Sequence, residues 1–207
     1  MSAKGKTTKG RLLSLGLDTL STGGLAGVTL GDLATKARMS KSGLFAHFSS
    51  KEQLQLDLLD EMVRVADANV VAPAMAAPKG LPRLSALFTN WIGWSTRAGL
   101  RGGCPVAAAI FELDDLSGVV RDRVAELDAR WRSLLAALVT ESIDCGHFKA
   151  NVDVEQFVWE LLGIYLSHHA SSRFIRDPKA DTRARMAFSS LIERAGVQGG
   201  NSCKQTC

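Results

Sequence analysis

The sequence predicts an all-α fold of about nine helices, and three observations support this prediction. Apolar residues recur at spacings of three and four along most of the 207 residues, which is the period of a helix with one buried face. No stretch alternates apolar and polar side chains as a half-buried strand would. Glycine and proline clusters separate the periodic stretches, as expected at helix ends.

The composition is that of a folded protein rather than a disordered one. Hydrophobic residues make up 46% of the chain and charged residues 22%, so a substantial core is possible. No apolar run approaches the roughly 20 residues of a membrane span, and the basic N-terminus has no apolar signal core, so we expect a cytoplasmic protein. The four cysteines follow no disulfide pattern.

A polar, cationic stretch precedes the first predicted helix. We expect residues 1–8 to be a frayed end, although an arm that enters a DNA minor groove has the same composition. Lys9–Leu20 then carries leucines on one helical face, and Gly23 and Gly24 stop it.

Two short helices around a tight turn follow. Thr29 and Asp32 have the spacing of a capping pair at a helix start. The helix after them carries apolar residues at the positions of one buried face, Leu30, Leu33, Ala34 and Ala37. That pattern stops near Arg38, and Ser40 can cap a second helix, Lys41–His47. The predicted order is helix, three-residue turn, helix.

The outward side of the second short helix is small, polar or cationic. Its residues there are Lys41, Ser42, Gly43 and His47. A helix that enters a DNA major groove needs such a side, because its first turn approaches base edges while hydroxyl, cationic and N–H groups meet phosphates. A third helix begins after Ser50, with Lys51 in its first turn. The alternative is an ordinary packing unit with solvated side chains.

Basic charge is concentrated in the same part of the chain. The net charge is +4, while residues 1–54 contain eight Lys or Arg against three Asp or Glu, a balance of +5 that leaves −1 for the rest. This distribution is typical of a chain whose N-terminal part binds a polyanion, although a membrane surface would also accept it.

The stretch from residue 29 to residue 54 resembles the DNA-binding domain of the TetR-like (tetracycline-repressor type) family of bacterial transcriptional regulators. The matching order is T-x3-L-A-x2-A-x-M-S-K-x-G-L-F-x-H-F-x-S-K-E-x-L. The resemblance implies that Lys41–His47 is the recognition helix and that Thr29, His47 and Lys51 hold phosphates. The DNA-contacting set that it implies is Thr29, Arg38, Ser40, Lys41, Ser42, Gly43, Phe45, His47 and Lys51.

Two positions depart from the family pattern. Arg38 stands at a turn position where such regulators commonly have glycine, and if this position needs a positive φ, a non-glycine residue costs on the order of 1 kcal/mol. Phe45 stands where tyrosine is common, so a hydroxyl contact to phosphate would be absent.

Helical patterns continue through the rest of the chain. The expected segments are Lys51 to about Val70, a helix from about Pro82 that includes Trp94, then Val106–Leu113, Ser117–Cys145, Val154–Ile175 and a last helix ending at Ala195. Ala72–Lys79, with two prolines, is the clearest compositional boundary. We expect an unstructured tail from Gly196 onward.

The apolar face of residues 154–175 covers more than half of the predicted helix. So wide a face exceeds one packing contact, so we expect burial against the chain's own core and against a partner subunit. The resemblance implies a homodimer in which the helices near 154–175 and 179–195 form a four-helix bundle with the same helices of a second copy. The expected domains are 1–54 for DNA binding, 55–195 for regulation and dimerisation, and 196–207 as a disordered tail.

The resemblance also implies an effector cavity in the second domain. The aromatic and histidine residues on its predicted segments are Trp91, Trp94, Phe111, Trp131, Tyr165 and His168. A concave site lined with tryptophan would suit a flat apolar ligand. For each residue alone, an ordinary core position is the stronger interpretation.

Metal and catalytic chemistry find little support in the sequence. His168 and His169 are adjacent, and adjacent helical residues point about 100° apart, so they seldom share one ion. We therefore expect no metal and no cofactor. A redox pair of Cys203 and Cys207 is less favoured than a tail without function. The chain has no G-x-S-x-G elbow and no phosphate loop between strand and helix, so we do not expect an enzyme.

These observations predict a ligand-responsive, homodimeric DNA-binding regulator. We expect a repressor that binds a palindromic operator and is released by a small apolar or aromatic effector. One alternative is a helical ligand-binding or adaptor dimer that no longer binds DNA. The two departures from the family pattern, Arg38 and Phe45, favour this alternative. A second alternative, an all-helical enzyme that uses the tryptophan-rich cavity, lacks a recognisable catalytic constellation.

Overall fold

Helices dominate the computed structural model, which describes the backbone of residues 3–197 and the side chains of residues 8–197. Within this range the chain forms helices and one isolated bridge between Phe148 and Gly196, and no strand. The all-α prediction is therefore confirmed. Most of the predicted tail, with Cys203 and Cys207, lies outside the described residues.

The chain divides into two compact units that alternate along the sequence. Unit 1 comprises residues up to 66 together with 95–128, and unit 2 comprises residues 67–94 together with the part after 128. The chain therefore passes from one unit to the other three times. The functional boundary expected after residue 54 stays a prediction, and it falls inside one continuous helix, Lys51–Ala66.

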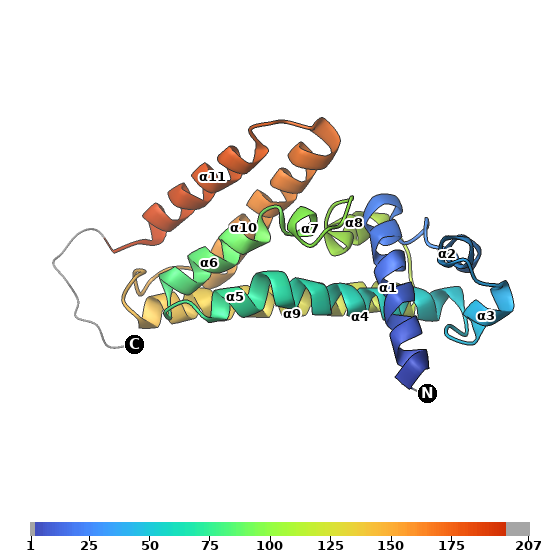
Figure 1. Ribbon diagram of the computed structural model, residues 1–207. Helices are drawn as coiled ribbons and strands as arrows, with labels where there is room; N and C mark the ends of the chain where they lie inside the picture. The colour runs from blue at the N-terminus through green and yellow to red at the C-terminus, as the bar shows by residue number, and fades with distance from the viewer. Residues whose placement is uncertain (1–2, 198–207) are drawn as a thin grey trace. The chain divides into compact units, whose positions relative to one another are not determined.

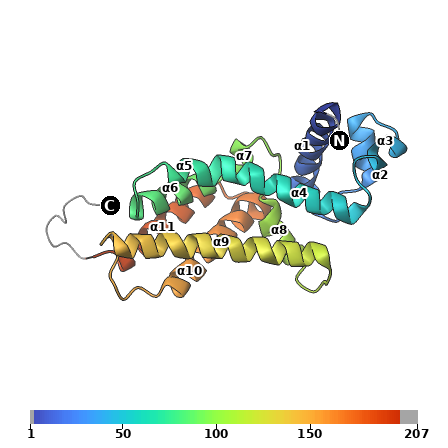
Figure 2. The ribbon, with the colours of Figure 1, turned by 90° about the horizontal axis from the view of Figure 1, so that it is seen from below.

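Unit 1 holds the helix-turn-helix and a segment from the middle of the chain. Its helices are α1 (Ala3–Gly23), α2 (Leu30–Ala37), α3 (Lys41–Phe45), α4 (Lys51–Ala66), α8 (Pro105–Glu112) and the first part of α9 (Val119–Asp144). Figure 2 shows α2 and α3 next to each other beside α1. Their shared core is formed by the buried side chains of Leu12, Leu20, Leu33, Leu44, Phe48, Leu54 and Leu58.

The start signals of the two short helices are confirmed. Thr29 caps α2, with its Oγ1 accepting a hydrogen bond from the Asp32 N–H at 3.0 Å. Ser40 caps α3, with its Oγ accepting from the Gly43 N–H at 3.1 Å. Two boundaries differ from the prediction. The helix α1 already begins at Ala3, and α3 ends at Phe45 rather than at His47.

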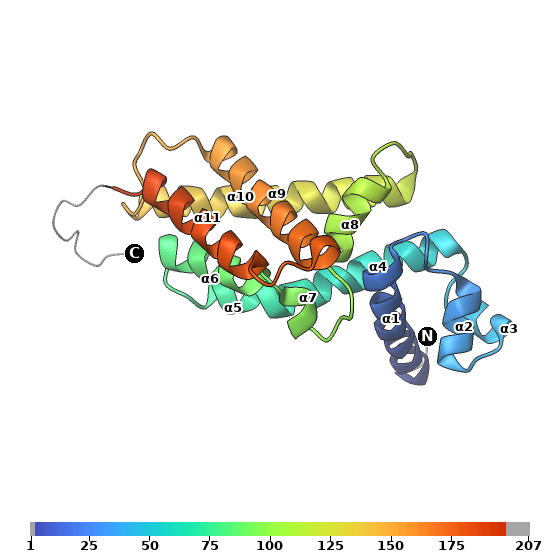
Figure 3. The same cartoon turned by 90° about the horizontal axis from the view of Figure 1, so that it is seen from above.

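Unit 2 holds the remaining helices. They are η1, a π-helical turn (Asp67–Val71), α5 (Ala72–Met75), α6 (Leu81–Trp91), the rest of α9, α10 (Val154–Ala170), η2, a second π-helical turn (Ser171–Ile175), and α11 (Ala180–Ala195). Figures 1 and 3 both show α10 and α11 side by side, in orange and red. Phe88 of α6 stacks on Phe188 of α11 with ring centroids 3.9 Å apart, which ties α6 into the same core.

The helix expected to include both Trp91 and Trp94 is interrupted. The helix α6 ends at Trp91, Gly93 has φ 70°, and the short helix α7 (Trp94–Arg97) begins directly afterwards. A positive φ is open to glycine at little cost, so Gly93 allows the chain to turn here. The two tryptophans therefore lie on different helices, and the boundary between the compact units falls within α7.

Candidate functional site

Helix α3 is the centre of the candidate nucleic-acid interface. Only Leu44 of its five residues is fully buried, and it anchors the helix to the unit 1 core. Lys41 and Ser42 are exposed, and 52% of the Phe45 surface is open to solvent. The first turn thus presents a cation, a hydroxyl and an aromatic ring, with Gly43 between them. Lys41, Ser42 and Gly43 belong to the outward side expected from the sequence, whereas the exposed ring of Phe45 was not part of that expectation.

The turn before α3 holds an arginine in a left-handed conformation. Arg38 has φ 54° and ψ 46°, and it closes the C-terminal end of α2. Its N–H donates to the Thr35 carbonyl at 3.1 Å, and the next N–H, that of Met39, donates to the Ala34 carbonyl at 2.9 Å. This position therefore does need a positive φ, which is the case in which a non-glycine residue such as Arg38 carries a strain cost. The Arg38 side chain itself is exposed.

The residues expected to hold phosphates surround these helices. Thr29 is partly exposed, and its hydroxyl donates to Asp32 Oδ2 at 2.7 Å. Lys51 is exposed in the first turn of α4, with its Nζ 3.4 Å from the Ala26 carbonyl oxygen. His47 lies just after α3, and its Nδ1 is buried without a hydrogen-bond partner. The neutral ring should therefore carry its proton on Nε2, because a buried N–H without an acceptor is costly.

Two cations of the N-terminal part are used inside unit 1. Lys9 Nζ lies 2.6 Å from Asp57 Oδ2, and it also lies 5.4 Å from the ring centroid of Phe48. Lys36 Nζ donates to Thr19 Oγ1 at 2.8 Å. A charge count along the sequence cannot detect such pairing. Apart from Lys36, the exposed cations within six residues of α3 are Arg38, Lys41 and Lys51.

Unit 2 gathers most of the residues expected around an effector. Trp91 stacks on Tyr165 with ring centroids 3.9 Å apart, and Trp131 meets Trp91 edge-on at 4.8 Å. Trp94 Nε1 donates to the Tyr165 hydroxyl at 3.2 Å. We call Trp91, Trp94, Trp131 and Tyr165 the aromatic cluster. Rings at these distances are in van der Waals contact, so a ligand could lie between them only by separating them.

His168 and Phe111 differ in their relation to this cluster. His168 is buried, its ring centroid lies 6.4 Å from that of Tyr165, and its Nε2 lies 2.7 Å from Asp181 Oδ1. Phe111 lies on α8 in unit 1 and exposes 63% of its surface, so it is not one of these packed rings. Trp131 Nε1 is buried and has no hydrogen-bond partner, so the cluster retains one unused donor.

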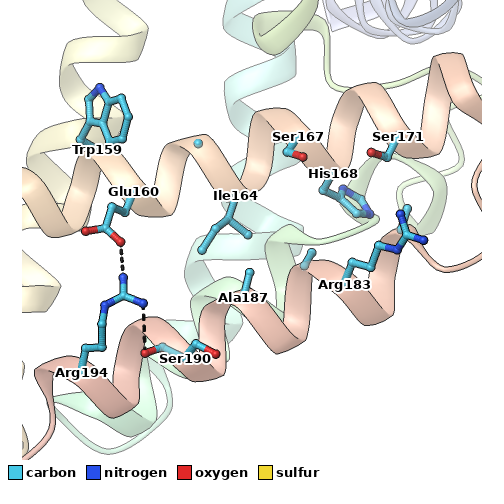
Figure 4. A pocket seen from close by; sticks show the side chains of 13 residues that line it. Trp159, Glu160, Ile164, Ser167, His168, Ser171, Arg183, Ala187, Ser190 and Arg194 are labelled. Carbon is cyan, nitrogen blue, oxygen red and sulfur yellow. Dashed lines mark hydrogen bonds and ion pairs between the residues drawn. The ribbon is translucent and has the colours of Figure 1, made fainter.

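A groove of about 550 Å³ runs along the exposed side of α10 and α11. Most of its lining residues are small, among them Gly163, Ser167, Ala187 and Ser190, and the charged residues Glu160, Arg183 and Arg194 also line it. Figure 4 shows Ile164 and Ala187 turned toward each other, and Glu160 paired with Arg194 at one end.

Trp159 lies at the end of this groove and was missed as a candidate residue. It exposes 66% of its surface, although the neighbouring Phe157 and Val158 are buried. The sequence signal that could have identified it was the width of the apolar face of residues 154–175, which includes a tryptophan on the side away from the core.

His169 lies near the C-terminal end of α10. Burial lowers the pKa of its imidazole, and the positive charge of Arg173 adds to this effect.

Two further properties concern metals and membranes. Among the described residues, no group of three or more His, Cys, Asp or Glu side chains is arranged to hold a metal ion. No helix in the described part of the chain combines the length and apolar character needed to cross a bilayer.

Two family descriptions match the chain. Residues 12–58 match "Bacterial regulatory proteins, tetR family", which covers the second half of α1, all of α2 and α3, and the first half of α4. Residues 80–188 match "Tetracyclin repressor-like, C-terminal domain", which is more than half of the chain. No curated protein matches the sequence.

Solved structures share the fold at low sequence identity. A TetR transcriptional regulator from Chloroflexus aurantiacus has a TM-score of 0.81 and 23% identity, with 93% of this chain and 96% of that chain covered. A putative regulator from Saccharomonospora viridis in complex with choline has a TM-score of 0.74 and 17% identity, covering 93% and 100%.

A third structure contains both a ligand and DNA. AibR in complex with isovaleryl coenzyme A and operator DNA has a TM-score of 0.69 and 19% identity, covering 91% of this chain and 98% of that chain. At such identities these structures show the fold, and the family descriptions carry the assignment. The chain therefore belongs to the TetR family of bacterial regulatory proteins.

Proposed function

We propose that this protein is a repressor that binds a palindromic operator as a homodimer and is released by a small apolar or aromatic effector. In such a complex two α3 helices enter successive major grooves, about 34–36 Å apart. We propose the compartment of the chromosome, the bacterial cytoplasm, as the site of action of such a regulator.

The observation that carries the proposal is the exposed first turn of α3. Lys41 and Ser42 stand at its start, and Gly43 adds no side chain that would hold the backbone away from base edges. We assign base contacts to Lys41 and Ser42. Phe45 is 52% exposed and can offer an apolar contact, for example to a thymine methyl group.

Phosphate contacts flank this helix. We assign them to Thr29 and Lys51, at the first turns of α2 and α4, and to the Nε2–H of His47. Helix starts favour anions, because their N–H groups are free and the helix dipole is positive there. Exposed Arg38, in the turn before α3, adds a cation on the same stretch of chain.

A second copy of the chain is the occupant that we propose for the groove of α10 and α11. The small residues on its floor, Gly163 and Ala187, would let two helix pairs approach closely, and Trp159 would supply a large apolar contact. Aromatic residues are enriched in protein interfaces. Symmetric pairing also supplies the two recognition helices that a palindrome requires.

The aromatic cluster is the effector region that we propose. A flat apolar molecule could replace the contact between Trp91 and Tyr165 with ring contacts of its own. Trp131 Nε1 would then offer a hydrogen bond to an acceptor on the ligand. Such a ligand lowers operator affinity only if it binds the two states of the protein with different affinity, and a nearly complete release needs several kcal/mol of difference.

Fluorescence anisotropy of a labelled DNA fragment tests the proposal. The fragment is taken from upstream of the protein's own coding region, and a scrambled duplex of equal length serves as control. We expect preferential binding to the upstream fragment and affinity that falls steeply with salt concentration, because phosphate contacts release counterions. Selection of bound sequences from random DNA would then define the operator.

The same experiment distinguishes the proposed function from the leading alternative. A ligand-binding or adaptor dimer without DNA binding would bind neither the upstream fragment nor any sequence selected from random DNA. Binding that is indifferent to salt would also contradict the proposed phosphate contacts.

A further inference from the structure

A carboxylate from the middle of the chain holds the loop that leads into the helix-turn-helix. Glu112, the last residue of α8, accepts two backbone hydrogen bonds, at 2.8 Å from the Leu25 N–H to Oε2 and at 2.5 Å from the Ala26 N–H to Oε1. Residues 24–28 connect α1 to Thr29, the cap of α2. Hydrogen bonds to an ionised acceptor are stronger than neutral ones.

The end of α1 is joined to the same segment by further contacts. The Arg101 guanidinium pairs with Asp18, with Nε 2.9 Å from Oδ2, and this hydrogen bond lowers the Asp18 pKa. The N–H groups of Gly102 and Gly103 donate to Ser21 Oγ at 3.1 Å and to its carbonyl at 3.2 Å. These bonds and those of Glu112 attach residues 101–112 to the end of α1 and to the loop that follows it.

Two glycines make this fit possible. A Cβ on Gly102 would lie 1.7 Å from the Ser21 carbonyl oxygen, and a Cβ on Gly24 would lie 2.5 Å from a Glu112 carboxylate oxygen. Gly24 also has φ 67°, which side chains disfavour. At Gly102 the absence of a side chain lets two backbones meet, and at Gly24 it makes room for the Glu112 carboxylate.

The carbonyl groups of the same loop are held by α4. Gln55 Nε2 donates to the Leu25 carbonyl at 2.8 Å, and Lys51 Nζ lies 3.4 Å from the Ala26 carbonyl. The Leu25 side chain is buried. The backbone at residues 25 and 26 is therefore fixed by Glu112 on its N–H side and by α4 on its carbonyl side.

We propose that Glu112 is a positioning residue for operator binding. By holding residues 25 and 26 it sets where α2 begins, and α2 in turn sets the turn and the α3 helix that we assign to the major groove. Loss of these two hydrogen bonds lowers operator affinity although Glu112 touches no DNA. The inference rests on the proposed function, since it concerns the same interface. It also assigns a role in DNA binding to a residue within the C-terminal family match, 80–188.

Hydrogen exchange of the full-length protein without DNA is the first part of the test. In Glu112→Ala the amides of Leu25 and Ala26 should exchange faster than in the wild type, whereas amides in α10 should not change. Asp114→Ala is the matched control, because it removes one negative charge two residues away and its carboxylate bonds only to the neighbouring Asp115 N–H among the described contacts. Unchanged exchange in Glu112→Ala would overturn the proposal.

Operator titration over a range of salt concentrations is the second part. We expect Glu112→Ala to bind about tenfold more weakly with an unchanged salt slope and unchanged sequence preference, because no phosphate or base contact is removed. Glu112→Gln keeps one acceptor oxygen and should recover part of the affinity. A changed salt slope, or faster exchange with wild-type affinity, would overturn the positioning role.

The two parts also separate this inference from the proposed function. If the wild type binds no DNA, the proposed function fails and the role of Glu112 in operator binding fails with it, while the exchange result still decides whether Glu112 holds the loop. If the wild type binds its operator and Glu112→Ala binds equally well, only the present inference fails.

Discussion

Helices α3 and α10 each bury one side and expose the other, but their exposed sides differ in chemistry. The five residues of α3 expose a cation, a hydroxyl and the ring of Phe45, and Leu44 alone is fully buried. The seventeen residues of α10 bury a wide apolar face and still expose Trp159 beside small residues. Cations and hydroxyls suit phosphates and base edges, whereas a large ring beside small residues suits another protein surface.

The two helices also differ in how they are held in place. A helix as short as α3 is not stable alone, so it depends on the Ser40 cap and on the Leu44 anchor. Helix α10 is capped by Asp153 and buries six side chains, so its outer side can accept substitutions without loss of the fold. Substitutions on the exposed side of each helix should therefore affect its partner more than its stability.

The largest effect is expected from Trp159→Glu. A carboxylate here would replace the large apolar contact of the indole in the proposed dimer interface, and the nearby Arg194 is already paired with Glu160, so we expect dimer dissociation to increase on the order of 100-fold. Operator affinity should fall with it, because one recognition helix then binds alone. Sedimentation velocity checks the first result and anisotropy the second. Trp159→Phe is the matched control, and a dimer that tolerates glutamate here would remove this groove as the interface.

The next effect concerns a base contact on α3. Lys41→Ala should weaken operator binding about tenfold or more and relax the sequence preference at one position of each half-site. Selection from random DNA with the variant measures both. Lys79→Ala, which removes an exposed cation in unit 2, should bind like the wild type. An unaltered preference would reassign Lys41 from bases to phosphates.

Lys51 should give a smaller and more uniform effect. Lys51→Gln removes a phosphate contact, so operator and random DNA should weaken by similar factors, and the salt slope should drop by about 1. Titrations at several salt concentrations measure this slope. If only the operator is affected, Lys51 acts through the Ala26 carbonyl rather than through a phosphate.

A pH effect is expected on the α10 side. The lowered pKa of His169 means that the folded state disfavours its cation, whose ordinary pKa is 6.5. As pH falls below this value the unfolded chain takes up the proton first, so wild-type stability is retained above pH 6.5 and declines below it. His169→Gln should lessen that decline between about pH 7.5 and 5.5 in urea titrations. An equal decline in both proteins would show that other groups dominate.

The smallest effect is expected from Arg38→Gly. Glycine relieves the left-handed strain at φ 54° but gains freedom in the unfolded chain, so the free energy of unfolding should change by less than about 1 kcal/mol. Urea titration measures it. Loss of the exposed cation should weaken DNA binding slightly, and a large loss of stability would mean that the Arg38 side chain supports the turn.

The helix-turn-helix was predictable because its signals are local. Thr29 and Ser40 act as caps over three residues, and the structure confirms both. Helical spacing indicated which segments carry the aromatic residues, but it did not show that Phe111 lies outside the cluster or that Trp91 contacts Tyr165, since these rings lie far apart in sequence. The break at Gly93 was missed because a single glycine does not always end an apolar helix.

The role of Glu112 was the least visible in the sequence. Its partner Leu25 lies 87 residues away, and it contributes only a backbone N–H, which every residue except proline has. No local pattern distinguishes such a carboxylate from an ordinary helix-end charge. The need for glycine at position 102, which lies against the Ser21 backbone, could not be read from the sequence either.

The alternation of the two compact units along the chain affects attempts to exchange parts between regulators. A hybrid made by joining one protein at residue 66 to the remainder of another would separate Leu25 and Ser21 from residues 101–112, which hold them. To obtain a functional hybrid, residues 95–128 would have to be transferred together with residues 1–66, or their contacts would have to be rebuilt in the recipient protein. Recombination at a single point therefore does not yield an interchangeable module from this protein.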